Sequence, residues 1–220
     1  VLEAGADSIL VRDAHDTARN LDPSQLPREA CILRGWGNDL YSMMSGLDAS
    51  FDAALMTGYH SWAGGDGNPL SHTMNLGIFQ VTMNGAPMSE FTLNALMAGS
   101  LGIPVPFLSG DEALCKMARR WIPGITTVAV NRGSGGAAFS IHPDVAVDRI
   151  AQGTAQALKG DWRACRVPMP EHYDLAVTFR EHKTAFSRSF YPGARLADPR
   201  TVAFSSEDFT EVLRFCHFVL

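Results

Sequence analysis

Residues 53–60 read Ala53-Ala54-Leu55-Met56-Thr57-Gly58-Tyr59-His60, an apolar run that ends in a histidine. A short apolar run bounded by loop residues is typical of a buried strand. Residues 61–72 follow with glycine, aspartate, asparagine and proline, which favour a loop, and they end at a second histidine, His72. This stretch predicts a strand that presents His60 at the rim of a sheet, with His72 at the far side of a long loop.

The same pattern of a strand followed by polar residues recurs on both sides of this stretch. We expect strands at 8–11, 31–35, 76–83, 103–111 and 126–130, and helices at 39–47, 89–98, 112–121 and 143–158. Because strands and helices alternate, the sequence predicts an α/β fold whose first domain, residues 1–162, is a three-layer, mainly parallel sheet. The glycine-rich and serine-rich residues 131–136 are expected to form a flexible connection.

The last quarter of the chain has a different pattern. A polar segment with prolines over residues 159–170 precedes expected strands at 175–179 and 201–204, each followed by an expected helix. This β-α-β-α order predicts a smaller α+β domain over residues 163–220.

Composition limits the classes of function. The 220 residues are 46% hydrophobic and 19% charged, as in a globular protein, and the net charge of -5 argues against nucleic acid as a partner. No apolar run reaches the length of a membrane-spanning helix, so no membrane contact is expected. The four cysteines lie far apart without a CxxC pair, which argues against a thiolate zinc site and favours reduced, buried thiols in a cytoplasmic protein.

Four residues at expected strand or helix ends are candidates for chemistry: His15, His60, His72 and Glu90. Neutral imidazole is the commonest metal ligand and a natural base near neutral pH, and a mixed nitrogen and oxygen set suits Zn2+. Structural roles are equally open: His15 as a partner of a neighbouring aspartate in its own loop, His60 as a buried, hydrogen-bonded core residue, and Glu90 as a carboxylate favoured by a helix start. No HExxH motif decides between these readings.

Four motifs in register carry a resemblance to a known family. They are Arg12-Asp13-Ala14-His15, Gly58-Tyr59-His60, Leu70-Ser71-His72 and Ser89-Glu90-Phe91-Thr92-Leu93-Asn94-Ala95. In this order and spacing the chain resembles the M55 family of zinc-dependent D-aminopeptidases.

The resemblance implies a hydrolase with two Zn2+ ions per subunit that releases N-terminal D-amino acids, notably D-alanine, from short peptides. It implies that His60 binds one zinc, that His15 and Glu90 bind the other, and that His72 is the catalytic residue, proposed in the family as a nucleophile. From chemistry alone, a general-base role for His72 through water is equally open. The resemblance also implies a homo-oligomer, a decamer built from two pentamers.

Two departures from the family pattern are present. The family uses an Asp-x-Glu pair as further metal ligands, and this chain has none. Residues 1–7 read as the end of a helix, so we expect that pair upstream of Val1, and we expect weak or single-metal occupancy without it. Residues 131–136 are mostly glycine and serine where the family has a loop with both lysine and arginine, so this segment departs from the substrate-binding loop that the resemblance implies. Two rival hypotheses remain: a metal-dependent amidase on the same scaffold, and a non-catalytic α/β binding or scaffold protein.

Overall fold

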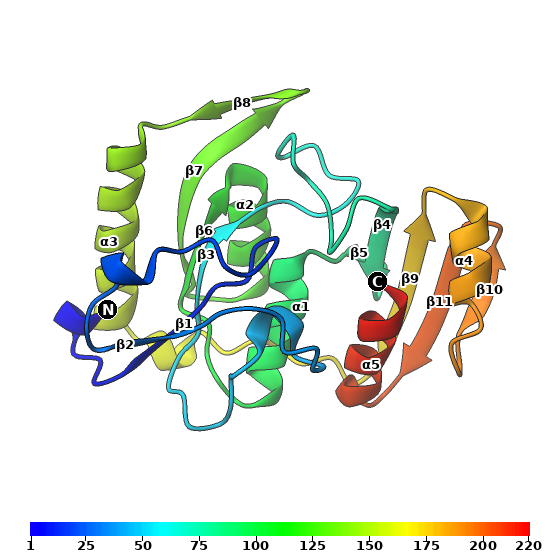
Figure 1. Ribbon diagram of the computed structural model, residues 1–220, viewed down its shortest axis with the longest axis horizontal. Coiled ribbons are helices and arrows are strands. Elements are labelled where there is room, and N and C mark those ends of the chain that lie inside the picture. Colours follow the sequence, from blue (N-terminus) through cyan, green and yellow to red (C-terminus); the bar gives the residue numbers. More distant parts are fainter.

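The computed structural model describes residues 1–220. The chain folds into three sheets and five α-helices (Figure 1). The helices are α1 (Glu90–Ser100), α2 (Glu112–Trp121), α3 (Pro143–Lys159), α4 (His182–Arg188) and α5 (Phe209–Val219). The strands are β1 (Ile9–Arg12), β2 (Ala30–Leu33), β3 (Leu55–Tyr59), β4 (Ile78–Met83), β5 (Ala86–Pro87), β6 (Phe107–Asp111), β7 (Thr126–Ser134), β8 (Ala137–Ser140), β9 (Tyr173–Phe179), β10 (Arg195–Asp198) and β11 (Thr201–Ser206). Short 3-10 helices occur at Leu2–Ala4, Pro23–Gln25, Ser42–Met44 and Trp162–Ala164.

The α/β expectation is confirmed by the sheet that carries the first histidine. Its strand order is β3-β6-β7-β8, in which β3, β6 and β7 run parallel and β8 is antiparallel. Successive residues of a strand point to opposite faces of a sheet. Gly153 of α3 lies against Val128 of β7, whereas Arg119 of α2 donates a hydrogen bond to the adjacent Thr127, so α2 and α3 cover opposite faces of this sheet. Strands β1 and β2 form a separate parallel pair.

The second large sheet is antiparallel and joins segments that are distant in the sequence. Its order is β10-β11-β9-β4-β5, so the hairpin of residues 78–87 pairs with strand β9 near the C-terminus. Helices α4 and α5 pack against β11 (Figure 1). The expected α+β character of the C-terminal part is present, and its sheet also includes two strands from earlier in the chain, β4 and β5. A domain division at residue 162 stays a prediction.

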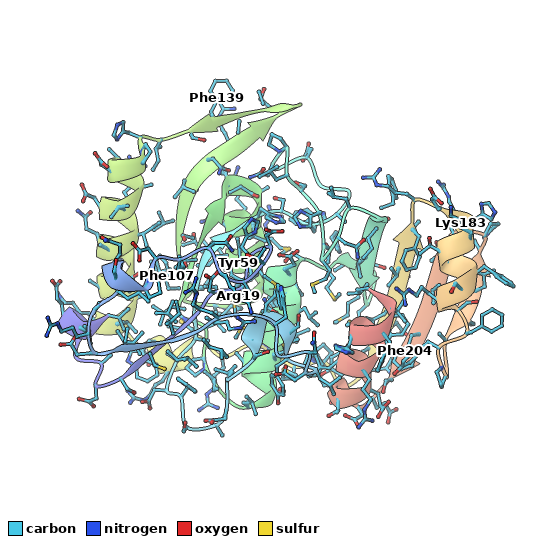
Figure 2. The ribbon with its side chains drawn as sticks, viewed as in Figure 1. Arg19, Tyr59, Phe107, Phe139, Lys183 and Phe204 are labelled. Carbon is cyan, nitrogen blue, oxygen red and sulfur yellow. The ribbon has the colours of Figure 1, made fainter.

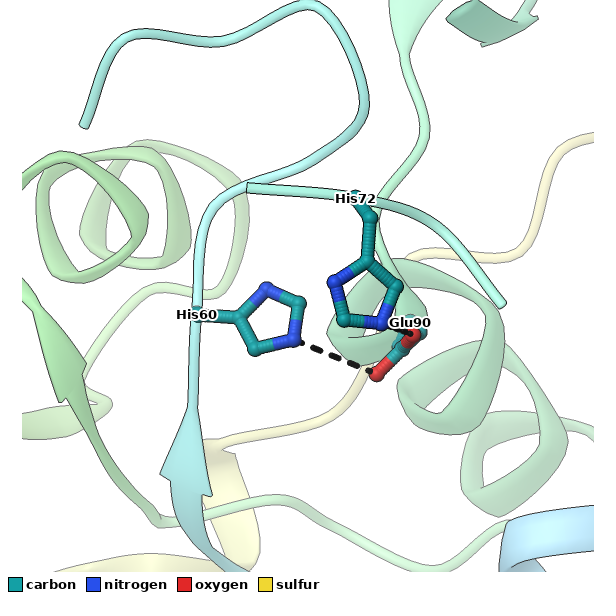
Figure 3. A group of neighbouring side chains, drawn as sticks. All are labelled: His60, His72 and Glu90. Atoms are coloured by element: carbon teal, nitrogen blue, oxygen red, sulfur yellow. Dashed lines mark ion pairs between the residues drawn. The ribbon is translucent and has the colours of Figure 1, made fainter. Parts of the chain in front are cut away.

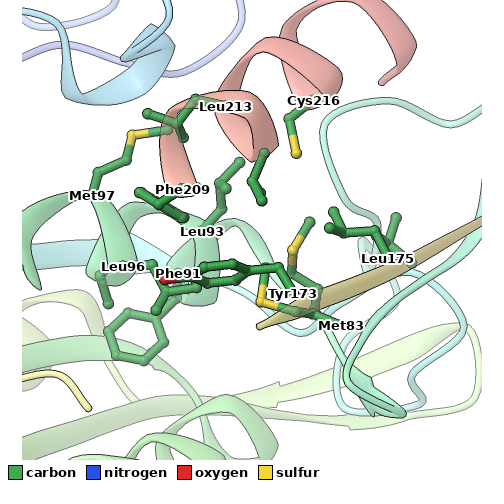
Figure 4. Packing of buried hydrophobic residues seen from close by; sticks show 14 of the residues in the cluster. Met83, Phe91, Leu93, Leu96, Met97, Tyr173, Leu175, Phe209, Leu213 and Cys216 are labelled. Carbon is green, nitrogen blue, oxygen red and sulfur yellow. The ribbon is translucent and has the colours of Figure 1, made fainter. Parts of the chain in front are cut away.

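Helix α1 lies between the two large sheets and is buried on almost every side. A helix that is apolar all round belongs in a protein interior. Figure 4 shows its residues Phe91 and Leu96 in one cluster with Phe209 and Leu213 of α5 and with Tyr173 of β9. One continuous core therefore links both sheets, and it fixes the position of the start of α1.

Two local expectations are wrong. Residues 39–47 are not an α-helix, because the Asp39 carboxylate accepts hydrogen bonds from the backbone N–H groups of Tyr41 and Ser42, and Ser42 has a left-handed φ of 51°. Only a single 3-10 turn remains there. Residues 131–136 are not a loose connection, because β7 continues to Ser134 and pairs with β8 in a hairpin.

That hairpin projects from the body of the molecule (Figure 1). Phe139 is exposed on it (Figure 2). The guanidinium carbon of Arg132 lies 4.0 Å from the centre of the Phe139 ring. Three of the cysteines are buried as expected, and Cys31 is exposed. None of the helices combines the length and the hydropathy that crossing a membrane would require.

Candidate metal centre

Three side chains from separate elements meet at the rim of the parallel sheet. His60 directly follows β3, His72 lies in the loop before β4, and Glu90 is the first residue of α1 (Figure 3). One potential ligand atom from each lies within 4.8 Å of those of the other two. The two imidazole ring centres are 4.4 Å apart. This convergence is the arrangement that a single cation needs.

The orientation of His60 follows from its neighbour in the chain. Its Nδ1 lies 2.9 Å from the backbone oxygen of Ser61. A carbonyl oxygen only accepts hydrogen bonds, so Nδ1 carries the proton. In the neutral ring the lone pair is then on Nε2, which lies 4.0 Å from a carboxylate oxygen of Glu90.

His72 has the same arrangement. Its Nδ1 lies 2.7 Å from the backbone oxygen of Leu70, and its Nε2 lies 3.5 Å from the other oxygen of Glu90. Both histidines therefore use Nδ1 to bond the backbone and direct Nε2 at the same carboxylate. This is the outer hydrogen bonding that fixes the tautomer of metal-binding histidines.

Glu90 is held from two directions. It is 9% exposed, and its Oε1 accepts the backbone N–H of Met74 at 2.9 Å. Ser89 caps helix α1, in a reciprocal pair with Thr92. The carboxylate at the positive end of a helix is thus fixed within a few ångströms of both imidazoles.

Two imidazole nitrogens and one carboxylate oxygen are a donor set that Zn2+ takes in hydrolytic sites, with a further position left for water or substrate. The residues present therefore fit a zinc ion. The side chains are also partly exposed, His60 by 18% and His72 by 26%, so a small molecule can reach them.

The glycine-rich loop that carries His72 is anchored along its length. The side-chain amide of Asn68 donates to the side-chain oxygen of Asn131 in β7 at 3.2 Å, and the backbone N–H of Gly133 donates to the carbonyl of Gly67 at 2.8 Å. The N–H of Ala63 donates to Thr73 at 3.1 Å. These hydrogen bonds hold the loop that carries His72 in one conformation, although its many glycines predict a flexible loop.

His15 lies outside this group of side chains. It is exposed in the loop after β1. The preceding Asp13 is buried and accepts the N–H of Leu21 at 2.8 Å. Desolvation opposes ionisation of Asp13, but the hydrogen bonds from Leu21 and Asn20 outweigh it and lower its pKa. The assignments of His15, His60 and Glu90 as ligands and of His72 as catalyst stay predictions.

Sequence reasoning missed a buried pair beneath the site. The side-chain amide of Asn94, one turn after Glu90 on α1, donates a hydrogen bond to the Tyr59 hydroxyl at 2.9 Å. Burial raises the pKa of Tyr59 to about 12. The pair ties the end of β3 to α1, so it holds the two elements that carry His60 and Glu90.

A cluster of imidazoles and a carboxylate that could hold a cation, placed at the rim of a parallel sheet, is typical of metal-dependent hydrolases. The chain belongs to the Peptidase_M55 family, described as D-aminopeptidase, whose model matches residues 1–218. The predicted family and the prediction of an enzyme, an aminopeptidase, are thereby confirmed.

A curated sequence and a solved structure, both from Bacillus subtilis, support this assignment. The chain is 32% identical over 210 residues to a D-aminopeptidase of strain 168, an overlap that covers 94% of this chain and 76% of the relative. It also superposes with a TM-score of 0.89 and 30% identity on a solved structure described as the Zn-dependent D-aminopeptidase DppA, a self-compartmentalizing protease. That match covers 98% of this chain and 78% of the solved one. The expected zinc cofactor agrees with the description of this solved relative.

Proposed function

We propose that this protein releases N-terminal D-amino acids, of the D-alanine type, from short peptides at a zinc centre. The observation that carries the proposal is the meeting of the two Nε2 atoms at Glu90. In the proposal, His60 binds one zinc ion and Glu90 binds the other together with His15, and zinc when bound would act as a Lewis acid toward the scissile carbonyl. Family membership supports the peptide substrate.

His72 is proposed as the catalytic residue. Its Nδ1 is occupied by the backbone of Leu70, so its Nε2 is the atom that can take a proton from water or attack the carbonyl. The same atom is also placed to bind metal, as part of the cluster of three. The choice between these roles decides which step fails when His72 is replaced.

A second zinc ion per subunit is part of the proposal, with His15 as a ligand beside Glu90. Its support is the family resemblance, since His15 lies outside the cluster of three side chains. We also propose a homo-oligomer, a decamer by resemblance, because the solved relative is described as a self-compartmentalizing protease. A cytoplasmic location is proposed because the four cysteines are free. Light scattering coupled to gel filtration measures the number of subunits.

The test compares hydrolysis of D-Ala peptides, L-Ala peptides and simple amides by the zinc-loaded protein. We expect turnover of the D-Ala peptides only, and we expect His72→Ala to abolish it. The matched control is His217→Ala, an exposed histidine on α5, which should retain wild-type rates. Turnover of amides alone would make the protein an amidase, and zinc binding without any turnover would make it a binding protein.

The number of zinc ions per chain, measured by elemental analysis, tests the two-metal part. Because residues 1–220 contain no Asp-x-Glu pair, we expect weak or single-metal occupancy of the unaltered chain. Under conditions that load both ions, His15→Ala should lower the count by one and His60→Ala should remove the other ion. A count that His15→Ala leaves unchanged would remove His15 from the site.

A further inference from the structure

Asp111, the last residue of β6, is a fully buried carboxylate next to the candidate metal centre. Its Oδ2 accepts the backbone N–H of Ser61 at 2.5 Å. Its Oδ1 accepts the Ser61 hydroxyl at 2.7 Å and the N–H of Leu114 at 2.9 Å. Burying a carboxylate is costly unless donors surround it, and here all three donors are neutral. The three hydrogen bonds offset the cost of burying this carboxylate.

Capping a helix explains only one of the three hydrogen bonds. The N–H of Leu114 belongs to the first turn of α2, and Asp111 is the N-cap of that helix. Asp208 caps α5 in the same way, by accepting the N–H of Thr210 at 2.7 Å, and it does so at the surface. The other two hydrogen bonds of Asp111 both go to Ser61, the residue after His60.

Ser61 links Asp111 to the imidazole. Its N–H and hydroxyl are held by Asp111, and its carbonyl accepts the Nδ1–H of His60 at 2.9 Å. We propose that Asp111 is a positioning residue of the metal centre, which fixes Ser61 and through it the tautomer and direction of His60. This inference rests on the proposed zinc site.

The packing around Ser61 leaves it no freedom to move away. Ser61 is fully buried. A Cβ added to Gly67 would lie 2.3 Å from the Ser61 hydroxyl and 2.5 Å from the Cβ of Ala113. A Cβ added to Gly110 would lie 2.4 Å from the carbonyl oxygen of Tyr59. The strand end that carries His60 is therefore enclosed by α2 and by the loop, and Asp111 is the polar group at the centre of this contact.

The test is Asp111→Asn. An amide oxygen in place of Oδ1 keeps the cap of α2 and the bond to the Ser61 hydroxyl, while the amide NH2 in place of Oδ2 faces the N–H of Ser61, donor against donor. Losing a direct outer partner of a metal-binding histidine weakens metal binding by about 10–100-fold, and Asp111 acts one step further out, through Ser61, so the lower end of that range, about 10-fold, applies. We therefore expect the dissociation constant for zinc, measured by competition with a chelator on the full-length protein, to rise by that factor.

Two readouts separate positioning from general stability. The visible absorption of the Co2+-substituted protein reports the ligand geometry, and 1H–15N spectra report which ring nitrogen of His60 carries the proton. Both should change in Asp111→Asn. The matched control is Asp208→Asn, which removes the same kind of charge from the cap of α5 and should leave the zinc affinity and both spectra as in the wild type.

Each outcome decides the proposal. An Asp111→Asn protein with wild-type zinc affinity and Co2+ spectrum would show that Asp111 only caps α2. If that variant fails to fold, Ser61→Ala removes one of the two links, and we expect a rise of about two- to fivefold in the zinc dissociation constant; an unchanged constant overturns the proposal. If His60→Ala, made in an otherwise wild-type chain, does not weaken zinc binding, the proposed metal site fails instead.

Discussion

Glu90→Gln removes the charge at the centre of the site and keeps its shape. In the wild type the carboxylate accepts the N–H of Met74 at 2.9 Å and lies at the start of α1. A hydrogen bond to a charged acceptor is worth ~1 kcal/mol more than one to a neutral acceptor. Its charge at the helix start adds about 0.3–1 kcal/mol. These two contributions sum to a loss of about 1.3–2 kcal/mol of unfolding free energy in the zinc-free variant. This is an upper value, because Glu90→Gln also removes the repulsion between the carboxylate and the two Nε2 lone pairs.

Zinc should widen that difference. At a free zinc concentration of about 1,000 times the dissociation constant, binding stabilises the wild type by about 4.1 kcal/mol. If the variant binds about 100-fold more weakly, the same concentration stabilises it by only about 1.4 kcal/mol. The gap in unfolding free energy should thus grow by about 2.7 kcal/mol when zinc is added.

Urea unfolding at pH 8, with and without zinc, measures both numbers. The control is Glu112→Gln, since Glu112 is also the first residue of a helix, α2, and pairs at the surface with Lys116 at 2.8 Å. An exposed ion pair is worth about 0–1 kcal/mol, so the control should lose little and the loss should not depend on zinc. A zinc-induced gain in Glu90→Gln equal to that of the wild type would refute Glu90 as a ligand.

Three further outcomes are expected from the packing around the site. Gly67→Ala should cost about 1–3 kcal/mol in urea unfolding, because its methyl would overlap the Ser61 hydroxyl; an unchanged midpoint would show that the loop yields. Because burial raises the pKa of Tyr59, keeping its hydroxyl neutral adds to the free energy of unfolding; this contribution is fully present below pH 10 and is lost as the pH rises to about 12. The difference between the 295 nm titrations of the wild type and of Tyr59→Phe should therefore contain no step near pH 10. Phe91→Ala should cost about 3–5 kcal/mol, because Phe91 is fully buried edge-on against Trp121, and a loss below 1 kcal/mol would contradict its place in the core.

Elements with local start and stop signals were predictable from the chain itself. Helix α2 has the predicted bounds, 112–121, and α3 begins at Pro143 after its His142 cap, as expected. Both starts depend on side chains within three residues of the helix, and such contacts are readable in a sequence.

Elements that depend on distant partners were not predictable. A helix was expected at residues 39–47. Leu40 and Met44 of this segment do pack against the core, but from a turn that Asp39 closes. The glycine-rich residues 131–134 form a strand because β8 pairs with them. In both places, contacts made in the folded state outweigh local preference.

The sequence by itself determined that strands and helices alternate, and it offered His15, His60, His72 and Glu90 as candidates for the chemistry, because both follow from residue type and short-range spacing. Only the tertiary structure decided that His72 joins His60 and Glu90 while His15 lies apart from them. Only it connected Asp111 to Ser61, fifty residues away. The physical reason is that these contacts require the parallel register of β3 with β6 and the burial of α1 between two sheets, and both are set by the core as a whole.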